Sequence, residues 1–298
     1  MPRLFVTGFF MGMADLIPGV SGGTVAFMSG IYEDLLSTIK DMSTNTLRLF
    51  FKFNIKEAIA SIPFKFLIPL FAGIFAAVLA LAKLLSYLLH TYPTFVWSLF
   101  FGLVIASTWL VAKRVKVWNT HKMVMFAAFA VIGYVLVGAV PVETPATLPM
   151  FFGSGMLAIV AMILPGISGS FILLIIGKYT QVLAAVKDMD IAALLAVMAG
   201  AVVGLGLFSR VLSWLFAKHH DISIAALSGF MLGSVRKLWP WKETILTRVN
   251  SHGEIVPLVE ANMLPEAFDG SVVFVIALMA VGIGIILYID RLELVKEG

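Results

Sequence analysis

Long apolar stretches set the first limit on what this chain can fold into. Six of them come near the roughly 20 apolar residues that a membrane-spanning helix needs. They cover residues 66–89, 94–112, 123–141, 191–216, 222–240 and 271–289. The fifth is the weakest, because its apolar run stops at Arg236. A water-soluble fold cannot bury so much apolar surface, and the sequence therefore predicts an all-α polytopic membrane protein.

The composition agrees with this class and argues against others. Of the 298 residues, 60% are hydrophobic and 13% are charged, whereas a soluble domain has about 25% charged residues. The absence of cysteine excludes disulfides and thiolate metal sites. The five histidines fall in predicted loops: His90, His121, His219, His220 and His252. We therefore expect no metal site and no cofactor. Basic cytoplasmic loops explain the net charge of +4 better than a nucleic-acid partner does.

Basic residues also set the expected orientation, since Lys and Arg gather in cytoplasmic loops. Residues 40–65 and 113–122 are rich in both, so we expect these segments and both termini on the cytoplasmic side. The 90–93 turn and the 141–149 loop then lie outside. The 236–267 segment is also expected outside, as an interfacial loop with tryptophans at headgroup level. Its basic residues and tryptophans are Arg236, Lys237, Lys242, Arg248, Trp239 and Trp241. These basic residues run against the orientation rule.

Two further apolar stretches, residues 4–36 and 150–184, are interrupted by proline and glycine. They are long for one span and badly broken for one helix. Each is interpreted as a re-entrant hairpin, in which two half-helices meet at the break. Non-helical backbone survives at membrane depth only where protein or a water-filled cavity covers it. The two breaks are therefore the first place to look for a site.

An internal repeat relates the two halves of the chain. Residues 8–42 align without a gap to 155–189, and 12 of the 35 pairs are identical, where chance gives about 2 to 3. A second gapless block aligns 72–107 to 199–234. The change of offset between the two blocks places an insertion at residues 43–65.

The repeat predicts the architecture. We expect a single membrane domain over residues 1–298, divided into repeat 1 (1–145) and repeat 2 (146–298). Each repeat holds one re-entrant hairpin and three transmembrane helices. Because three is odd, the second copy is expected to be inverted relative to the first. Inverted repeats with discontinuous helices are typical of transporters, whose substrate site lies near the midplane between the copies.

The two breaks share a sequence that is suited to binding an anion. Proline ends the first half-helix and glycine lets the backbone turn. The predicted helix-break residues are Pro18, Gly19, Pro165 and Gly166. The next half-helix begins with free N–H groups and a positive dipole end. The predicted substrate-binding residues here are Ser21, Gly22, Gly23, Thr24, Ser168, Gly169 and Ser170. The alternative is that these small residues only allow close helix packing.

Charged residues inside the apolar stretches are further candidates. Lys83 and Arg210 occupy equivalent positions in the second aligned block, and a cation inside the membrane is costly and usually functional. Both are predicted to bind the substrate in one central cavity, unless they snorkel to the interface. Asp15, whose counterpart is Met162, and Glu33 are candidates for proton coupling. Weaker candidates for a functional role are Lys178, Arg236 and Lys237.

Three short runs resemble a known family. GMADLIPGVSGGT (12–24), followed by GIY (30–32), is similar to the signature of the PopT-type polyprenyl-phosphate transporter family, and LPGISGS (164–170) is similar to that family's second signature. The resemblance covers nearly the whole chain. It implies a multi-pass protein of the bacterial cytoplasmic (inner) membrane. Such a flippase returns undecaprenyl phosphate, the carrier lipid of cell-envelope synthesis, from the outer to the inner leaflet.

Without the resemblance, the residues indicate only a membrane transporter with an anion site, and alternatives stay open. A transporter or channel for a small anion would have a closed polar pathway instead of a site open to lipid. A membrane lipid phosphatase would need a positioned nucleophile or metal, which the sequence does not indicate, so we expect no enzyme activity. The expected partners are the polyprenyl-phosphate lipid and membrane lipids. Proton or sodium coupling and a homo-oligomer are left open.

Overall fold

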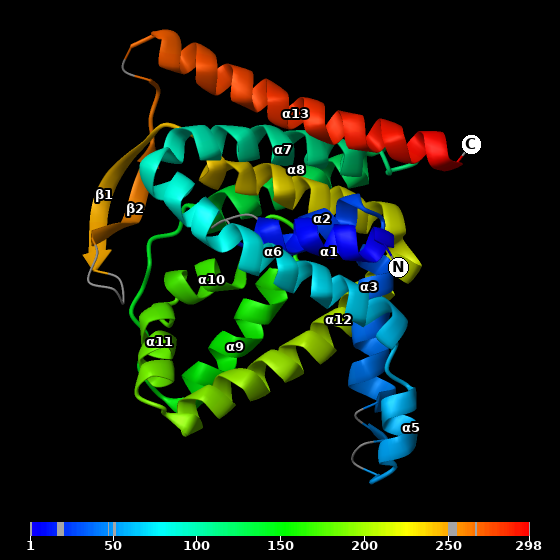
Figure 1. Cartoon of the computed structure of the whole chain (residues 1–298). Coiled ribbons are helices and arrows are strands. Elements are labelled where there is room, and N and C mark those ends of the chain that lie inside the picture. The colour runs from blue at the N-terminus through cyan, green and yellow to red at the C-terminus, as the bar shows by residue number, and fades with distance from the viewer. Residues whose placement is uncertain are drawn as a thin grey trace. The chain divides into compact units, whose positions relative to one another are not determined.

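The computed structural model describes residues 2–16, 21–46, 48–49, 52–249, 255–265 and 267–297. The predicted break residues Pro18 and Gly19 lie outside the described residues. The helices are α1 (Pro2–Asp15), α2 (Gly22–Met28), α3 (Tyr32–Asp41), α5 (Ile55–Ala60), α6 (Phe64–Thr91), α7 (Pro93–Ala112), α8 (Thr120–Val137), α9 (Leu148–Ile163), α10 (Gly169–Ile175), α11 (Tyr179–Lys187), α12 (Ile191–Ser234) and α13 (Gly270–Glu297) (Figure 1). A π-helical turn, η1 (Met42–Thr46), follows α3, and a 3-10 turn, η2 (Val235–Leu238), follows α12.

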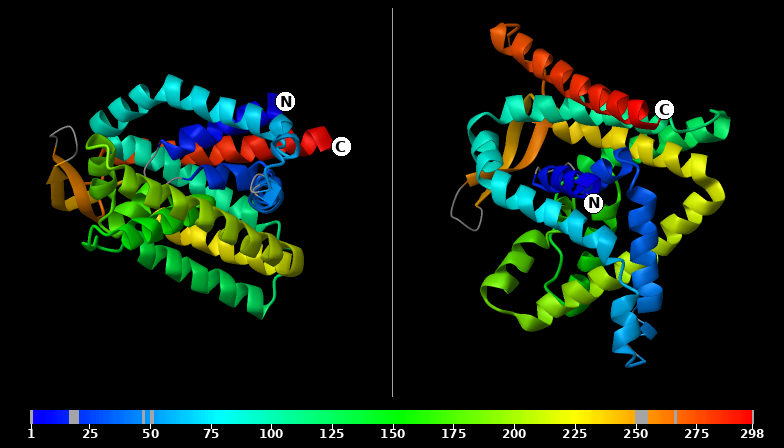
Figure 2. Two further views of the ribbon diagram at one scale, coloured as in Figure 1. Left: turned by 90° about the horizontal axis from the view of Figure 1, so that it is seen from below. Right: turned by 45° about the vertical axis from the view of Figure 1, so that its right-hand side comes forward.

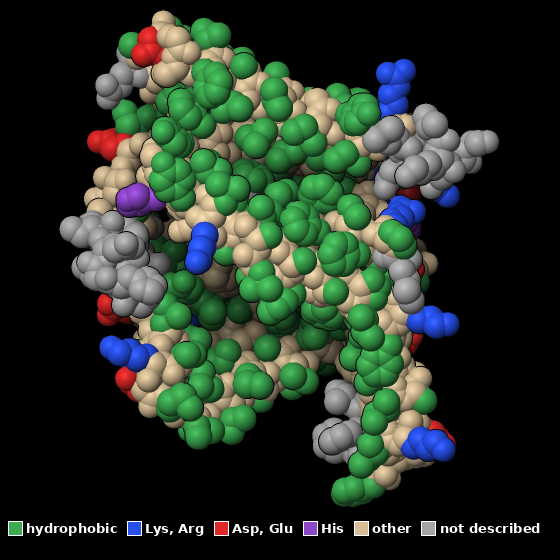
Figure 3. Space-filling model, in the orientation of Figure 1, with side chains coloured by type: hydrophobic (Ala, Val, Ile, Leu, Met, Phe, Trp, Pro, Cys, Tyr) green, Lys and Arg blue, Asp and Glu red, His purple; other side chains and the backbone are tan. Residues whose placement is uncertain are grey.

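The long apolar helices confirm a polytopic membrane protein. Among the described residues, five helices are long and apolar enough to cross a membrane, or six if the bent α10–α11 pair counts as one span. The predicted spans 191–216 and 222–240 are both parts of α12, which has a kink at His219 (φ −136°, ψ 48°). Large apolar side chains cover the outer surfaces of these helices, as Figure 3 shows. Such surfaces suit contact with lipid tails.

Each broken stretch forms three helices, so the prediction of two half-helices was wrong. In the first stretch α1, α2 and α3 follow one another, and in the second α9, α10 and α11 do. The additional bend lies at Gly30 and at Gly177, where φ is +73° and +67°. Glycine adopts this left-handed backbone without the steric cost that other residues meet. Helices α10 and α11 are bent by 105°.

The helix bounds recur at the offsets of the sequence repeat. Helices α2 and α10 differ by 147 residues at both ends. Helices α6 and α12 begin 127 residues apart, at Phe64 and Ile191. The local structure therefore repeats along with the sequence.

The chain forms two compact units, which do not coincide with the two repeats. Unit 1 contains Met1–Ala82 and Pro141–Ser223, and unit 2 contains Lys83–Val140 and Ile224–Gly298. The first hairpin (α1 to α3) and the second hairpin (α9 to α11) both belong to unit 1. Most of α6 and the first part of α12 belong to it as well. Unit 2 holds α7, α8, α13 and the last part of α12. Each unit is thus assembled from both repeats.

Unit 2 also contains a β-hairpin that the sequence reading missed. Strands β1 (Lys242–Val249) and β2 (Ile255–Asn262) pair antiparallel, with Lys242 opposite Asn262. The prediction of an interfacial loop over 236–267 was therefore wrong in its local structure. Within the same unit, α7 and α13 lie side by side (Figures 1 and 2).

Candidate functional site

The two hairpins of unit 1 meet at their breaks. Helix α9 ends at Ile163, and the last carbonyl groups of a helix have no intrahelical partner. At membrane depth such groups must be satisfied by protein. The hydroxyl of Ser21 donates to the carbonyl oxygen of Met162 at 3.1 Å, and the hydroxyl of Tyr32 donates to that of Ile163 at 3.1 Å. The first hairpin thus supplies hydrogen-bond donors that the end of α9 needs.

The second hairpin also donates a hydrogen bond to the first. The N–H of Gly166 donates to the Thr24 hydroxyl oxygen at 3.0 Å, and Gly166 has a φ of +97°. Gly23 packs so closely that an added Cβ would lie 2.7 Å from the carbonyl oxygen of Ile163. Ser21 and Thr24 are both almost fully buried. The hydroxyls that we predicted as substrate donors therefore also join the two hairpins.

The N-terminus of α2 already binds a carboxyl group from this chain. The N–H of Gly22 donates to the carboxylate oxygen Oδ1 of Asp15 at 2.7 Å. The next N–H, of Gly23, donates to the Ser21 hydroxyl oxygen at 3.1 Å. Asp15, predicted as a proton-coupling residue, thus occupies the position that we predicted for a substrate anion. Two anions repel each other at one site.

The matching end of α10 is capped by its own serine. The Ser168 hydroxyl oxygen accepts from the N–H of Phe171 at 3.3 Å, and the hydroxyls of Ser168 and Ser170 lie 3.3 Å apart. Ser168 is nearly buried, whereas Ser170 is exposed. Pro165 and Gly166, the predicted break residues, follow the end of α9 and precede Gly169, the first residue of α10.

Lys83 belongs to unit 2 and Arg210 to unit 1. Both side chains are exposed. The guanidinium of Arg210 donates to the carbonyl oxygen of Ser43 at 3.2 Å and to the Thr44 hydroxyl at 3.0 Å. Arg210 therefore holds the insertion next to α12. That both cations face one cavity stays a prediction.

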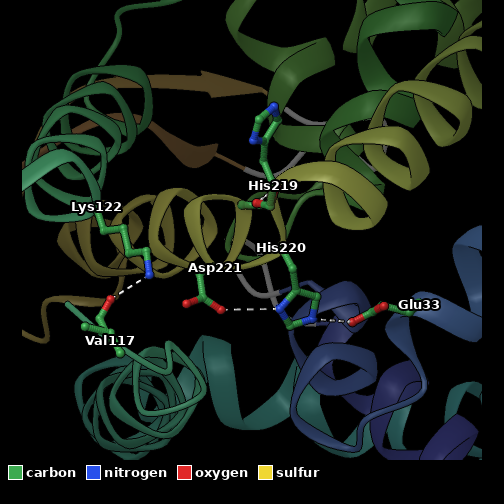
Figure 4. A network of polar contacts seen from close by, with 7 residues as sticks. Glu33, Val117, Lys122, His219, His220 and Asp221 are labelled. Atoms are coloured by element: carbon green, nitrogen blue, oxygen red, sulfur yellow. Dashed lines mark hydrogen bonds and ion pairs between the residues drawn. The ribbon is translucent and has the colours of Figure 1, made fainter. Parts of the chain in front are cut away.

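Glu33 belongs to a small polar network at the kink of α12 (Figure 4). Nε2 of His220 lies 3.1 Å from Oε1 of Glu33, and Nδ1 of His220 lies 3.6 Å from Oδ1 of Asp221. The imidazole thus links α3 to α12 within unit 1. The prediction that the histidines lie in loops was wrong for His90, His121 and His220, which are in helices, whereas His219 lies at the kink of α12 with a non-helical backbone. His252 lies outside the described residues.

Lys178, a weaker candidate for a functional role, is a buried lysine. Its side chain is fully buried, and its ammonium donates to the carbonyl oxygens of Thr144 and Pro145 and to Oε1 of Gln181. The ammonium also lies 4.8 Å from the ring centre of Phe151. These bonds use the donors of the ammonium to anchor the segment before α9. The signal for this role was a lysine where the first repeat has isoleucine.

Removing the hydroxyl of Tyr32 should destabilise the joint between the hairpins. In the Tyr32→Phe variant the ring keeps its contacts with Phe27 and Phe216, at 4.9 and 5.9 Å, while the carbonyl of Ile163 loses its donor. An unsatisfied buried acceptor costs about 1–3 kcal/mol. We expect a lower thermal unfolding midpoint for the detergent-solubilised protein. Tyr87→Phe, at an exposed position, is the control, and equal midpoints for the two variants would contradict the role of the hydroxyl.

Comparison with known proteins shows which proteins the chain is related to. Residues 11–256 match the model of the undecaprenyl phosphate translocase-like family. A polyprenyl-phosphate transporter of Vibrio cholerae is 43% identical over 265 residues, which cover 89% of this chain and 86% of that protein. The chain belongs to the undecaprenyl phosphate translocase-like family.

A second relative is less similar in sequence. A polyprenyl-phosphate transporter of Staphylococcus aureus is 31% identical over 251 residues, which cover 78% of this chain and 84% of that protein. No solved structure matches the chain. The translocase-like family match includes the first hairpin from residue 11 onward, the whole second hairpin, Lys83 and Arg210. It also confirms the family resemblance that the two signature runs indicated.

The features of this translocase-like chain that sequence reasoning missed are mostly pairings. The joint between the hairpins depends on Tyr32, whose identity with Tyr179 in the repeat was a visible signal. The hydrogen bond between Asp15 and Gly22 and the contact between His220 and Glu33 had no such signal in the sequence. Both depend on how the chain folds back across a break or a kink.

Proposed function

We propose that this protein is a flippase that moves undecaprenyl phosphate from the outer to the inner leaflet of the bacterial cytoplasmic membrane. Family membership and the two relatives named polyprenyl-phosphate transporter support the substrate class. The apolar helices support a multi-pass membrane protein. The proposal assigns transport to the chain, and no enzymatic step.

The physical task is to carry a charged headgroup across about 30 Å of hydrocarbon. The isoprenoid tail is as apolar as the lipid around it and needs no protein. The phosphate needs hydrogen-bond donors and positive charge along its path, because a bare charge in hydrocarbon is costly. Broken helices supply such groups at membrane depth. We therefore place the midplane site at the joint of the two hairpins, and propose that the repeats are inverted and expose this site alternately to the two sides.

Protonation of Asp15 is the proposed link between this site and the proton gradient. The phosphate headgroup competes with the Asp15 carboxylate for the N–H of Gly22, which the carboxylate holds at 2.7 Å. The headgroup binds there once Asp15 is protonated and its charge is removed. Exchange of a proton on Asp15 for a phosphate beside it would link transport to the proton gradient. Glu33, next to His220, is the second candidate for this coupling.

The observation that carries the proposal is the hydrogen-bonded joint of two broken helices in a chain of this family. The residues proposed to bind the phosphate there are Ser21, Gly22, Gly23, Thr24, Ser168, Gly169 and Ser170, and the predicted break residues are Pro18, Gly19, Pro165 and Gly166. Lys83 and Arg210 are proposed to complete the phosphate path. Their long side chains can reach a headgroup from exposed positions.

Neutralising both cations should slow transport. For the Lys83→Gln/Arg210→Gln double variant in proteoliposomes, we expect the rate of undecaprenyl phosphate movement to fall about tenfold or more, because two charge-assisted contacts to the phosphate are lost. A probe that binds the lipid only from outside reports the rate. Lys65→Gln/Lys218→Gln removes the same charge from the same two helices, α6 and α12, and should leave the rate near that of the wild type.

Two outcomes would count against parts of the proposal. If the double variant transports at the rate of its control, Lys83 and Arg210 are not on the phosphate path. If wild-type protein moves no undecaprenyl phosphate but takes up a small anion, the substrate is wrong and the alternative of a small-anion transporter replaces it.

A further inference from the structure

Unit 2 contains a small polar pocket where α8 ends and the β-hairpin begins. Its walls come from the end of α8, from η2 and from both strands. Its lining includes Gly138, Arg236, Lys237, Lys242, Glu260 and Asn262. All of them belong to unit 2, so this pocket is distinct from the hairpin joint of unit 1.

Cationic side chains outnumber acidic ones among the described residues that line this pocket. Lys237 and Lys242 share one carboxylate oxygen, Oε2 of Glu260, at 3.0 and 3.4 Å. Arg236 is a third cation, and within the described part of the chain Glu260 is the only acidic residue of the lining. The Lys242 side chain is only 7% exposed. A buried cation such as Lys242 is costly unless it is paired, and an anion in the pocket would stabilise it.

The third cation is held in place by its surroundings. The guanidinium of Arg236 donates to the carbonyl oxygen of Tyr134 at 3.0 Å and lies 4.3 Å from the centre of the Tyr134 ring. Asn262 donates to the backbone carbonyl of Arg236 at 2.8 Å. A Cβ at Gly138 would collide with the guanidinium. The pocket wall is therefore ordered before any ligand arrives, which lowers the cost of binding.

Tryptophans beside the pocket suggest the kind of anion. The ammonium of Lys242 lies 4.2 Å from the ring centre of Trp97, and the rings of Trp239 and Trp241 are 5.5 Å apart. Tryptophan is enriched at the level of lipid headgroups. The same segment is expected on the outer side, where its basic residues run against the usual charge rule. An anionic headgroup in the pocket would account for both features.

We propose that this pocket binds the phosphate monoester headgroup of a lipid, with Lys237 and Lys242 turning from Glu260 towards the phosphate. A phosphate monoester carries about 1.5 to 2 negative charges at neutral pH, which suits a pocket with three cations in its lining. The inference rests on the proposed function, since it gives the substrate a first site on the side where outward-facing lipid would arrive. Free phosphate has the same chemistry and is separated from the lipid by experiment.

Binding to the full-length protein in detergent tests the pocket. The probes are farnesyl monophosphate, inorganic phosphate and farnesol, and the variants are Lys242→Gln and Lys237→Gln. For farnesyl monophosphate, each variant is expected to raise the Kd about tenfold, through loss of one charge-assisted contact. Farnesol, which lacks the phosphate, should bind all proteins alike. Lys113→Gln, at an exposed position of unit 2, should bind as the wild type does.

Gly138→Ala is a second variant that leaves every charge in place. It displaces the guanidinium of Arg236 and should weaken farnesyl monophosphate binding without removing a cation. This keeps the test decisive if a lysine variant fails to fold. Equal Kd values for Lys237→Gln, Gly138→Ala and Lys113→Gln would overturn the pocket.

The pH dependence of farnesyl monophosphate binding is an independent test of Lys242 as a phosphate ligand. Burial lowers the pKa of Lys242 to about 8, with Lys237 adding to the shift and Glu260 opposing it. Above that pH the lysine loses its proton, so farnesyl monophosphate affinity should fall between about pH 7 and about pH 9. Lys242→Gln should lack this fall. An unchanged pH profile in the variant would exclude Lys242 as a phosphate ligand.

The remaining outcomes separate this inference from the proposed function. If inorganic phosphate binds as tightly as farnesyl monophosphate, the ligand is free phosphate and the lipid assignment fails. If the variants lose binding while the wild type moves no polyprenyl phosphate, the pocket stands and the proposed function fails. If the wild type transports and the variants bind as the wild type does, only the pocket fails.

Discussion

Replacing Gly23 with alanine should strain the joint between the two hairpins and slow transport. The added Cβ would lie 2.7 Å from the carbonyl oxygen of Ile163, a backbone atom that cannot turn aside as a side chain can. Overpacking of this kind costs about 1–3 kcal/mol. Any backbone shift would also stretch the hydrogen bond from Ser21 to Met162. We expect a lower unfolding midpoint and a transport rate reduced about tenfold or more.

A matched control exists in the same unit. Gly153 lies within α9, and nothing stands within 4 Å of a Cβ placed there. Gly153→Ala should be neutral or slightly stabilising, because alanine favours a helix over glycine by about 1 kcal/mol. Thermal unfolding and transport in proteoliposomes measure both variants. Should Gly23→Ala transport as fast as Gly153→Ala, close contact at this joint is not needed for function.

Replacing Asp15 with asparagine should uncouple transport from the proton gradient. The asparagine carbonyl can still accept from the N–H of Gly22, so the cap on α2 remains and the protein should fold. The side chain no longer takes up or releases a proton, and it carries no charge to repel a phosphate. We expect wild-type transport to respond to an imposed pH gradient and the Asp15→Asn variant to move the lipid at a rate that the gradient does not change.

The control for this experiment is Asp34→Asn, which removes one carboxylate from an exposed position in the first turn of α3. It should keep the wild-type response to the gradient. A gradient response that survives in Asp15→Asn would assign coupling elsewhere. Glu33→Gln would then be the next variant, since Glu33 is the other acidic candidate and pairs with His220.

The sequence predicted the long elements well, because a run of about 20 apolar residues has few alternatives in a membrane. It predicted α6 over 66–89, and the helix runs over Phe64–Thr91. The prediction failed at positions where the backbone conformation of a few residues determines the direction of the chain. The bends at Gly30 and Gly177 need a positive φ, and glycine also occurs at many positions where no such bend exists. The β-hairpin was missed because it is short and mixes charged with apolar residues.

That a substrate binds at the two breaks stays a prediction, and the sequence did not reveal the contacts between them. The Pro-Gly runs marked the two breaks, and the structure brings described residues of both breaks into contact. The bonding pattern depends on partners far apart in the chain, such as Thr24 and Gly166. Propensities of single residues carry no information about such pairs. The same holds for Lys237 and Lys242. The sequence places them in a predicted loop, whereas in the structure both form ion pairs with Glu260.

The hydrogen bonds between the hairpins also determine when the protein can finish folding during synthesis. Ser21 and Met162 are 141 residues apart, and ribosomes add about 5–20 residues per second. The first hairpin therefore waits roughly 7 to 28 seconds in the membrane before its partner is made. During that interval its buried hydroxyls need another partner, such as water, lipid or the insertion machinery. A chain stopped between the two repeats would keep its first hairpin in this unfinished state and would be exposed to quality control.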